Sequence, residues 1–346
     1  MRPAGCQHLP DGTLFQRFEF VHALYREVFY RRQAEARRAK LHQRIGEHLE
    51  ALCSERLGEV APELAHHFEE GSDWPRAMKY LRLAAETAGR RYALPETTAL
   101  LRHALDLLGN LPEAERAVNE TEVLAKLATV YIVSFDGRAI DTYEALVQRA
   151  AHYGLIDVEV RALLDMAYPL SWNSSERCLG VVERALRLSA RQEDPLMQAT
   201  TRASCFVRRL WVCGWDLRDA EECRKALAEI RAAGDPIVLA RHLVDYGFVQ
   251  WVSSEYREAH RSTVESLAIL SRKGEEHPYL SLAYWYSQFI VPWSLLFVGE
   301  WGEALREIKA RITMVDKNGD QFRAQTLRLY QAWVLRYGLC WGPGDL

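Results

Sequence analysis

Histidines, cysteines and carboxylates are the residues of this 346-residue chain whose types could hold a metal ion or carry a reaction. A metal centre needs three or four ligands that converge, as when two histidines one helical turn apart flank a glutamate. No His-Glu-x-x-His string occurs, the adjacent His66 and His67 would diverge by about 100° on a helix, and His42 and His48 fall on different faces. We therefore predict structural or surface histidines, no metal and no other cofactor.

Catalysis by a nucleophile or on a nucleotide also lacks its motifs. The cysteines are scattered, with none in a Cys-x-x-Cys pair, and no Gly-x-Ser-x-Gly turn is present. A phosphate-binding loop needs the dipeptide Gly-Lys, which does not occur in the chain. Paired carboxylates such as Glu69-Glu70 and Glu221-Glu222 fall where a solvated surface is expected. The sequence therefore predicts a protein that is not an enzyme and has no catalytic residues.

Composition and charge narrow the class of protein further. The formal net charge of −3 argues against a dedicated nucleic-acid binder, which usually carries a basic excess. The odd number of scattered cysteines is typical of a reducing compartment, and Met1 to Thr13 lacks the apolar core of a signal peptide, so we expect a cytoplasmic protein. The uncharged stretch from Pro278 to Gly299 is long enough to cross a bilayer, but Gln288, Pro292 and its scattered aromatic residues favour a buried helix.

Aromatic residues repeat along the chain with a period of about forty residues, which is the length of a helical-repeat unit. Tyr131 precedes the first tryptophan of the series by 41 residues, and the tryptophans then follow at intervals of 39, 40, 42 and 40. The series consists of Trp172, Trp211, Trp251, Trp293 and Trp333. We interpret these residues as core contacts between stacked helices; the alternative is a groove that binds a peptide or a small ligand.

The segments after the tryptophans also resemble one another. A polar break is followed by a bulky residue three positions before an alanine, as in Leu217 to Ala220, Tyr256 to Ala259 and Trp301 to Ala304. An aromatic-rich first helix, a short turn and an amphipathic second helix make a hairpin, which buries its apolar stripe only by stacking on its neighbours. The sequence therefore predicts an all-α, right-handed solenoid of helical hairpins, with about seven hairpins over residues 56–346 and the last one incomplete.

The stretch from Pro62 to Leu108 matches the tetratricopeptide pattern most closely. Small and large residues alternate there at spacings of 3, 6, 3, 4 and 3 residues, by which the two helices of such a repeat interlock. Gly71 to Asp73 supplies the turn, with Asp73 as the N-cap of the second helix. The predicted core residues are Ala65, Phe68, Trp74, Ala77, Leu81 and Ala84.

Residues 1–55 do not follow the repeat pattern. The sequence predicts a short strand there around Phe18 to His22, and helices over Ala23 to Tyr30 and Arg37 to Leu52. Three strings there and just beyond carry a resemblance: FEFVHALYREV at 18–28, RRAKLHQRIG at 37–46 and ELAHHFE at 63–69. They resemble the junction that follows the nucleotide-binding domain of bacterial STAND signalling ATPases, a class that includes MalT-like transcriptional regulators and predicted ATPases linked to adenylate cyclase.

The resemblance covers about residues 14–110 and implies a partial winged-helix segment over residues 1–55, followed by a tetratricopeptide-like sensor array. In that class an ATPase module precedes these parts, so an ATPase or output domain is expected upstream or in a separate chain. The missing phosphate-binding loop departs from the class, and we therefore expect the regulatory part of a larger system, without ATP hydrolysis of its own.

Two groups of residues are candidates for contact with a partner. Seven basic residues lie between Arg26 and Arg44 against two glutamates; they suit a solvated helix face, a contact with another domain, or DNA phosphates. The surplus tryptophans outside the repeat series are candidates for ligand contact. The candidate contact residues are Arg31, Arg32, Arg37, Arg38, Trp215 and Trp285.

The leading functional hypothesis is a sensor and scaffold module that binds a protein, a peptide or a small inducer and regulates an attached ATPase. A second hypothesis is a free-standing tetratricopeptide adaptor, with self-association through the incomplete last hairpin. A third is nucleic-acid binding through Arg26 to Arg44, which the overall charge makes the weakest of the three.

Overall fold

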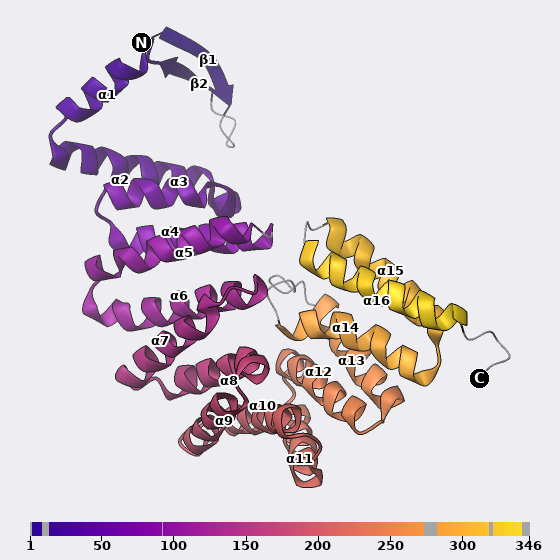
Figure 1. Cartoon of the computed structure of the whole chain (residues 1–346). Helices are drawn as coiled ribbons and strands as arrows, with labels where there is room; N and C mark the ends of the chain where they lie inside the picture. The colour runs from indigo at the N-terminus through magenta and orange to yellow at the C-terminus, as the bar shows by residue number, and fades with distance from the viewer. Residues whose placement is uncertain (1, 9–13, 92, 273–281, 318–320, 341–346) are drawn as a thin grey trace. The chain divides into compact units, whose positions relative to one another are not determined.

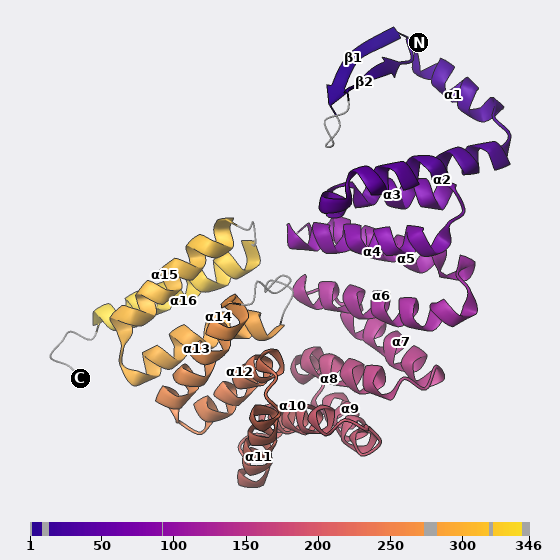
Figure 2. The same ribbon diagram turned by 180° about the vertical axis from the view of Figure 1, so that it is seen from behind.

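The computed structural model of the protein describes residues 2–8, 14–91, 93–272, 282–317 and 321–340. The chain divides into two compact units, unit 1 (residues 1–88 and 95–123) and unit 2 (residues 89–94 and 124–346). Both units are built mainly of packed α-helices, which Figure 1 labels in chain order and Figure 2 shows from behind. The predicted all-α fold of helical hairpins is thereby confirmed.

A β-hairpin precedes the helices of unit 1. Strand β1 (Arg2–His8) pairs antiparallel with β2 (Leu14–Glu19), and helices α1 (Ala23–Arg32) and α2 (Glu35–Leu52) follow. The sequence predicted a strand only near β2, because Pro3 and Gly5 in β1 are depleted in strands and typical of loops. Pairing with β2 overrides that local preference.

Helices α3 (Leu57–Glu70) and α4 (Trp74–Arg90) form the hairpin that was predicted from the tetratricopeptide spacing. A short 3₁₀ turn (Ser54–Arg56) leads into α3, and the Asp73 carboxylate accepts a hydrogen bond from the Arg76 amide at 3.1 Å, as expected of an N-cap. Of the six predicted core residues, five are at most 3% exposed and Trp74 is half-buried.

Close approach of α2 to α3 depends on a glycine. A Cβ atom on Gly46 would stand 3.0 Å from the ring of Phe68, which is fully buried. The same ring stacks on Tyr80 at a centroid distance of 5.6 Å, and the Arg76 guanidinium lies over it at 4.2 Å. Phe68 is therefore enclosed by residues from α2, α3 and α4.

Helix α5 (Leu94–Leu107) and a 3₁₀ turn (Leu108–Asn110) lead to α6 (Glu113–Val133), from which successive hairpins follow. The remaining helices are α7 (Arg138–His152), α8 (Ile156–Asn173), α9 (Ser175–Ser189), α10 (Pro195–Cys213), α11 (Leu217–Ala233), α12 (Pro236–Val252), α13 (Tyr256–Arg272), α14 (Leu282–Val298), α15 (Trp301–Lys317) and α16 (Gln321–Cys340).

Neighbouring helices of unit 2 pack in chain order, and the first helices of successive hairpins also contact one another: α8 with α10, α10 with α12, and α12 with α14. We call these first helices, together with α6 and α16, the first-helix row. Within a hairpin, α12 approaches α13 closely, because Gly247 leaves room for Thr263 and for the Ala259 carbonyl. In the described part of the chain, no helix has the length and apolar character needed to span a bilayer.

A recurring turn joins the two helices of several hairpins. One residue with a left-handed backbone is followed by an acidic residue, as at Ser72-Asp73, Phe135-Asp136, Ser254-Glu255 and Gly299-Glu300. In each, the amide of the acidic residue donates to the carbonyl five residues earlier, which satisfies an unpaired carbonyl at the helix end. The left-handed residue of each turn is a fixed reference point, from which the position of each aromatic residue in the series can be counted.

Candidate functional site

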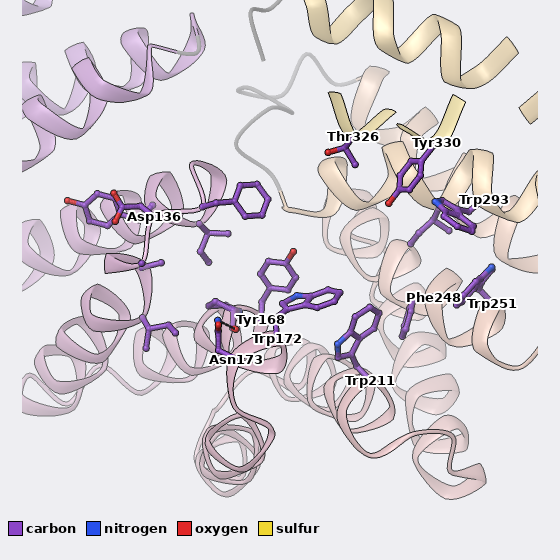
Figure 3. Close-up of a pocket in the computed structure, with 18 residues that line it drawn as sticks. Asp136, Tyr168, Trp172, Asn173, Trp211, Phe248, Trp251, Trp293, Thr326 and Tyr330 are labelled. Carbon is purple, nitrogen blue, oxygen red and sulfur yellow. Dashed lines mark hydrogen bonds between the residues drawn. The ribbon is translucent and has the colours of Figure 1, made fainter. Parts of the chain in front are cut away.

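A pocket of about 710 Å³ opens in unit 2, and its wall is mostly aromatic. The first-helix row supplies most of the wall, since α6, α8, α10, α12, α14 and α16 each contribute residues, and the turn after α6 and the start of α7 complete it (Figure 3). The lining residues labelled in the figure are Asp136, Tyr168, Trp172, Asn173, Trp211, Phe248, Trp251, Trp293, Thr326 and Tyr330.

The aromatic rings of the wall touch one another in a continuous series. Ring centroids lie 4.6 Å apart for Trp172 and Trp211, 4.6 Å for Trp211 and Phe248, and 6.2 Å for Phe248 and Trp251. On the far side, Trp293 lies 5.2 Å from Tyr330. Figure 3 shows the Trp172 and Trp211 rings projecting toward the same open space as Tyr330. This surface suits an apolar ligand group that can lie flat against rings.

None of the five tryptophans of the series is fully buried, although Trp293 packs against the buried cluster of Val315, Ala324 and Leu327. Trp172 is 60% exposed and Trp333 38% exposed, while Trp211, Trp251 and Trp293 are half-buried. All of these except Trp333 line the pocket, so the alternative interpretation of the series, a groove, describes these positions better. For Trp172, Trp211 and Trp251 the physical reason is their place in the last turn of the first helix, where the packed helix face ends.

The turns also reveal a slip in the register of the series. Trp211 and Trp251 stand three residues before a left-handed residue (Gly214 and Ser254), whereas Tyr131 stands four residues before one and Trp293 six. One residue on a helix rotates a side chain by about 100°, while three residues return it to nearly the same face. Tyr131 is 4% exposed and still lines the pocket, whereas Trp211, Trp251 and Trp293 are half-buried there. Equal spacing in the sequence therefore concealed different orientations.

One rim of the pocket is the turn between α6 and α7. Phe135 has a left-handed backbone (φ 54°), an uncommon conformation for a bulky residue, and its ring is 56% exposed at the pocket. Next to it, Asp136 accepts hydrogen bonds from the amide and the guanidinium of Arg138, which lower the pKa of its carboxyl to about 2. Asp136 is thus a charged group that is already paired.

The predicted basic candidates lie in unit 1, and none of them lines a described pocket. Arg31, Arg32 and Arg37 are exposed, and Arg31 pairs with Glu27 at 2.6 Å. Arg38 is half-buried, with its guanidinium 5.1 Å from the centre of the Tyr30 ring. Large apolar side chains are exposed on the same two helices, namely Leu24, Tyr25, Val28 and Phe29 on α1 and Leu41 and Ile45 on α2.

The structure describes the side chain of one of the two candidate tryptophans, and that one lies outside the site. Trp215 is 45% exposed in the turn between α10 and α11, but it does not line the pocket. The side chain of Trp285, in α14, falls outside the described residues. The sequence signal that would have identified the pocket was the turn position of each repeat aromatic residue rather than the excess of tryptophan.

A histidine network that the sequence did not predict links three helices of unit 1. His42 contacts the Tyr30 hydroxyl at 2.9 Å through Nε2 and His67 at 2.9 Å through Nδ1, and Tyr30 donates to Glu70 at 3.2 Å. Burial lowers the pKa of both His42 and His67. Among the described residues, no group of three or more side chains has the geometry to hold a metal ion, so the network is a set of hydrogen bonds.

Comparison with known proteins gives distant structural similarities. No protein-family model matches the chain, and no curated protein matches it. A crystal structure of BtubC (BKLC) from P. vanneervenii is 19% identical, with 71% of this chain and 94% of that chain covered and a TM-score of 0.44. The apo form of RapI is 13% identical (80% and 80% covered, TM-score 0.48). A Rap protein complexed with competence and sporulation factor is 12% identical (91% and 92% covered, TM-score 0.49).

Proposed function

We propose that this chain is a non-catalytic binding module that takes a peptide segment of a protein partner, or a small inducer, in the aromatic pocket of unit 2. The observation that carries the proposal is the continuous aromatic wall from Trp172 to Trp251 with an exposed ring at its end. Burial of apolar surface drives such binding, and aromatic side chains give large contact area at low entropic cost.

Peptide selection tests this proposal directly. Random twelve-residue peptides displayed on phage are selected on the wild-type chain and then titrated against Trp211→Ala and, as a control, Trp215→Ala. We expect the selected peptides to be rich in aromatic and aliphatic residues and to lose at least about tenfold in affinity on Trp211→Ala, since that is 1.4 kcal/mol. Selected peptides that bound Trp211→Ala as well as wild type would contradict the proposal.

We further propose that the module is the sensor part of a STAND-type signalling or transcriptional regulator. The strings at 18–28, 37–46 and 63–69 support it, together with the exposed apolar and basic side chains of α1 and α2, which suit a contact with another protein domain better than a solvated surface alone. In this proposal the ATPase domain contacts unit 1, and ligand binding in unit 2 regulates it.

The DNA around the gene distinguishes this regulator from a free-standing adaptor. The regulator requires an in-frame phosphate-binding loop upstream of the Met1 codon or in a neighbouring gene. If such a loop is encoded, the separate ATPase domain should bind the chain, and exchange of Val28 and Phe29 for serine should weaken that complex. If none is encoded, the adaptor function holds and the regulator proposal fails.

A further inference from the structure

On several helices of the first-helix row, charged residues lie on the same helix face as the wall aromatic residue and precede it by one to three helical turns. On α8, Arg161, Asp165, Tyr168 and Trp172 are spaced by 4, 3 and 4 residues, which places them on one stripe of the helix. On α10, Arg208 stands three residues before Trp211. The aromatic wall therefore continues into a charged surface on the same side of the row.

The third helix of this surface repeats the pattern. On α12, Arg241, Asp245 and Phe248 are spaced by 4 and 3 residues. A small cavity of about 20 Å³ between α10 and α12 is lined by Arg208 and Asp245 together with Trp211 and Phe248, which also line the large pocket. The charged groups thus begin where the aromatic wall ends.

Most other charges on α8, α10 and α12 are already paired. Glu159 accepts from Arg184 at 2.5 Å, Arg209 donates to Asp219 at 2.8 Å, and Asp157 accepts from Gln192 at 2.9 Å. Arg202 pairs with Glu229. What remains on the three helices is the group Arg161, Asp165, Arg208, Arg241 and Asp245.

This remaining group has one more positive than negative charge. Burial raises the pKa of the Asp165 carboxyl, and Arg161, Arg241 and Arg208 lower it in turn, so all three guanidiniums lie within electrostatic reach of one carboxylate. Among the described residues, none of the three makes an ion pair within 4.0 Å; Arg208 lies over the Tyr168 ring at 5.2 Å. The three guanidiniums outnumber the two carboxylates of this group, Asp165 and Asp245, so the surface keeps a net positive charge that is suited to an incoming anion.

We propose that the ligand of the pocket is amphiphilic, with an apolar ring or chain against the aromatic wall and a single anionic group, such as a carboxylate, facing Arg208 and its neighbouring arginines. This inference rests on the proposed binding function and adds the charge of the ligand. Two sources carry this chemistry: a small organic acid, and a partner segment with an acidic residue next to aromatic ones.

A pair of fluorescent probes separates the apolar from the anionic contribution. 8-Anilinonaphthalene-1-sulfonate carries an anion on its rings, and N-phenyl-1-naphthylamine has the same rings without the sulfonate. We expect Arg208→Gln to weaken binding of the anionic probe about five- to tenfold and to leave the neutral probe unchanged. Trp211→Ala should weaken both probes. Arg187→Gln, on the exposed surface of α9, serves as the matched charge control and should change neither.

The outcomes distinguish the two levels of the proposal. If Arg208→Gln changed both probes equally, or neither, the anionic subsite would be wrong while the apolar pocket stood. If Trp211→Ala changed neither probe, the proposed binding function itself would fail. Far-UV circular dichroism of each variant checks that it is folded; should Arg208→Gln not fold, Arg161→Gln and Arg241→Gln carry the same expectation, because they are exposed.

Displacement of the bound anionic probe then identifies the source. Indole-3-acetate is compared with indole-3-acetamide, and an aromatic-rich peptide with one aspartate is compared with the same peptide carrying asparagine. If indole-3-acetate displaces the probe at a severalfold lower concentration than indole-3-acetamide does, the ligand is a small acid. If instead the aspartate peptide displaces it at a severalfold lower concentration than the asparagine peptide does, the ligand is a partner segment. Equal displacement by charged and neutral members in both pairs would overturn the proposal.

Discussion

Aromatic residues near the ends of first helices differ in burial between the two units. In unit 1, Phe68 is fully buried because Gly46 lets α2 close over it, while Tyr80 and Arg76 of α4 cover the ring from the other side. In unit 2, Trp172 is 60% exposed and contributes its ring to a pocket. The residue class and the repeat position are thus similar, and the covering helix decides between core and binding surface.

The largest expected effect tests the core side of this contrast. Phe68→Ala should lower the free energy of unfolding by about 3–5 kcal/mol, because it removes a fully buried ring and leaves a cavity. Trp172→Ala should cost less than about 1 kcal/mol, since most of that ring is already in contact with water. Urea unfolding followed by circular dichroism measures both. Equal losses would show that Trp172 belongs to a core after all.

Close packing within a hairpin gives the next effect. A Cβ atom on Gly247 would stand 2.7 Å from the Thr263 hydroxyl oxygen and 3.2 Å from the Ala259 carbonyl oxygen, so Gly247→Ala should destabilise by about 1–3 kcal/mol despite alanine's better helix propensity. Gly180→Ala is the control, because nothing lies within 4 Å of its Cβ position, and it should stabilise by about 0.5–1 kcal/mol. Stabilisation by both changes would contradict the close approach of α12 and α13.

Strain at the pocket rim should produce an effect of opposite sign. Phe135→Gly is expected to stabilise the chain by about 1 kcal/mol, because glycine adopts the left-handed backbone (φ 54°) without steric cost. It should at the same time weaken binding of the neutral apolar probe, since an exposed ring is removed from the rim. Phe135→Ala keeps the strain and removes the ring, so thermal unfolding of the two variants isolates the backbone contribution. Equal melting temperatures of Phe135→Gly and Phe135→Ala would contradict the proposed backbone strain.

The smallest effect is a pH dependence that arises in unit 1 from His42 and His67. Burial lowers the pKa of His42 and His67 below the 6.5 of the unfolded chain, so the unfolded state binds protons that the folded state excludes. Stability from this pair should be complete above pH about 6.5 and be lost as the pH falls below it. The nearby charges are Glu70, Glu63, Arg38 and His66.

Urea unfolding at pH 7.5 and pH 5.0 measures this dependence. His42→Asn should reduce the difference in unfolding free energy between the two pH values, whereas His152→Asn, an exposed residue of α7, should leave it as in wild type. An unchanged difference in His42→Asn would place the acid sensitivity elsewhere in the chain.

Local residue patterns were sufficient to predict the helices and part of the core. The small and large alternation over Ala65 to Ala84 identified a buried hairpin, because interlocking helices need those sizes at those places whatever lies further away. The same reasoning missed β1, whose Pro3 and Gly5 are typical of loops, and it missed the network through His42 and His67, which are 25 residues apart in sequence.

The sequence by itself determined that the chain is a series of helical hairpins, because period, turn residues and amphipathic pattern are local properties. Only the tertiary structure decided which aromatic residues are buried and which form a pocket. That depends on whether another helix covers the side chain, as α4 covers Phe68 whereas the Trp172 ring stays open to the pocket. A one-residue shift rotates a side chain by about 100° and leaves the spacing of the tryptophans nearly unchanged, so the period alone could not distinguish core from binding surface.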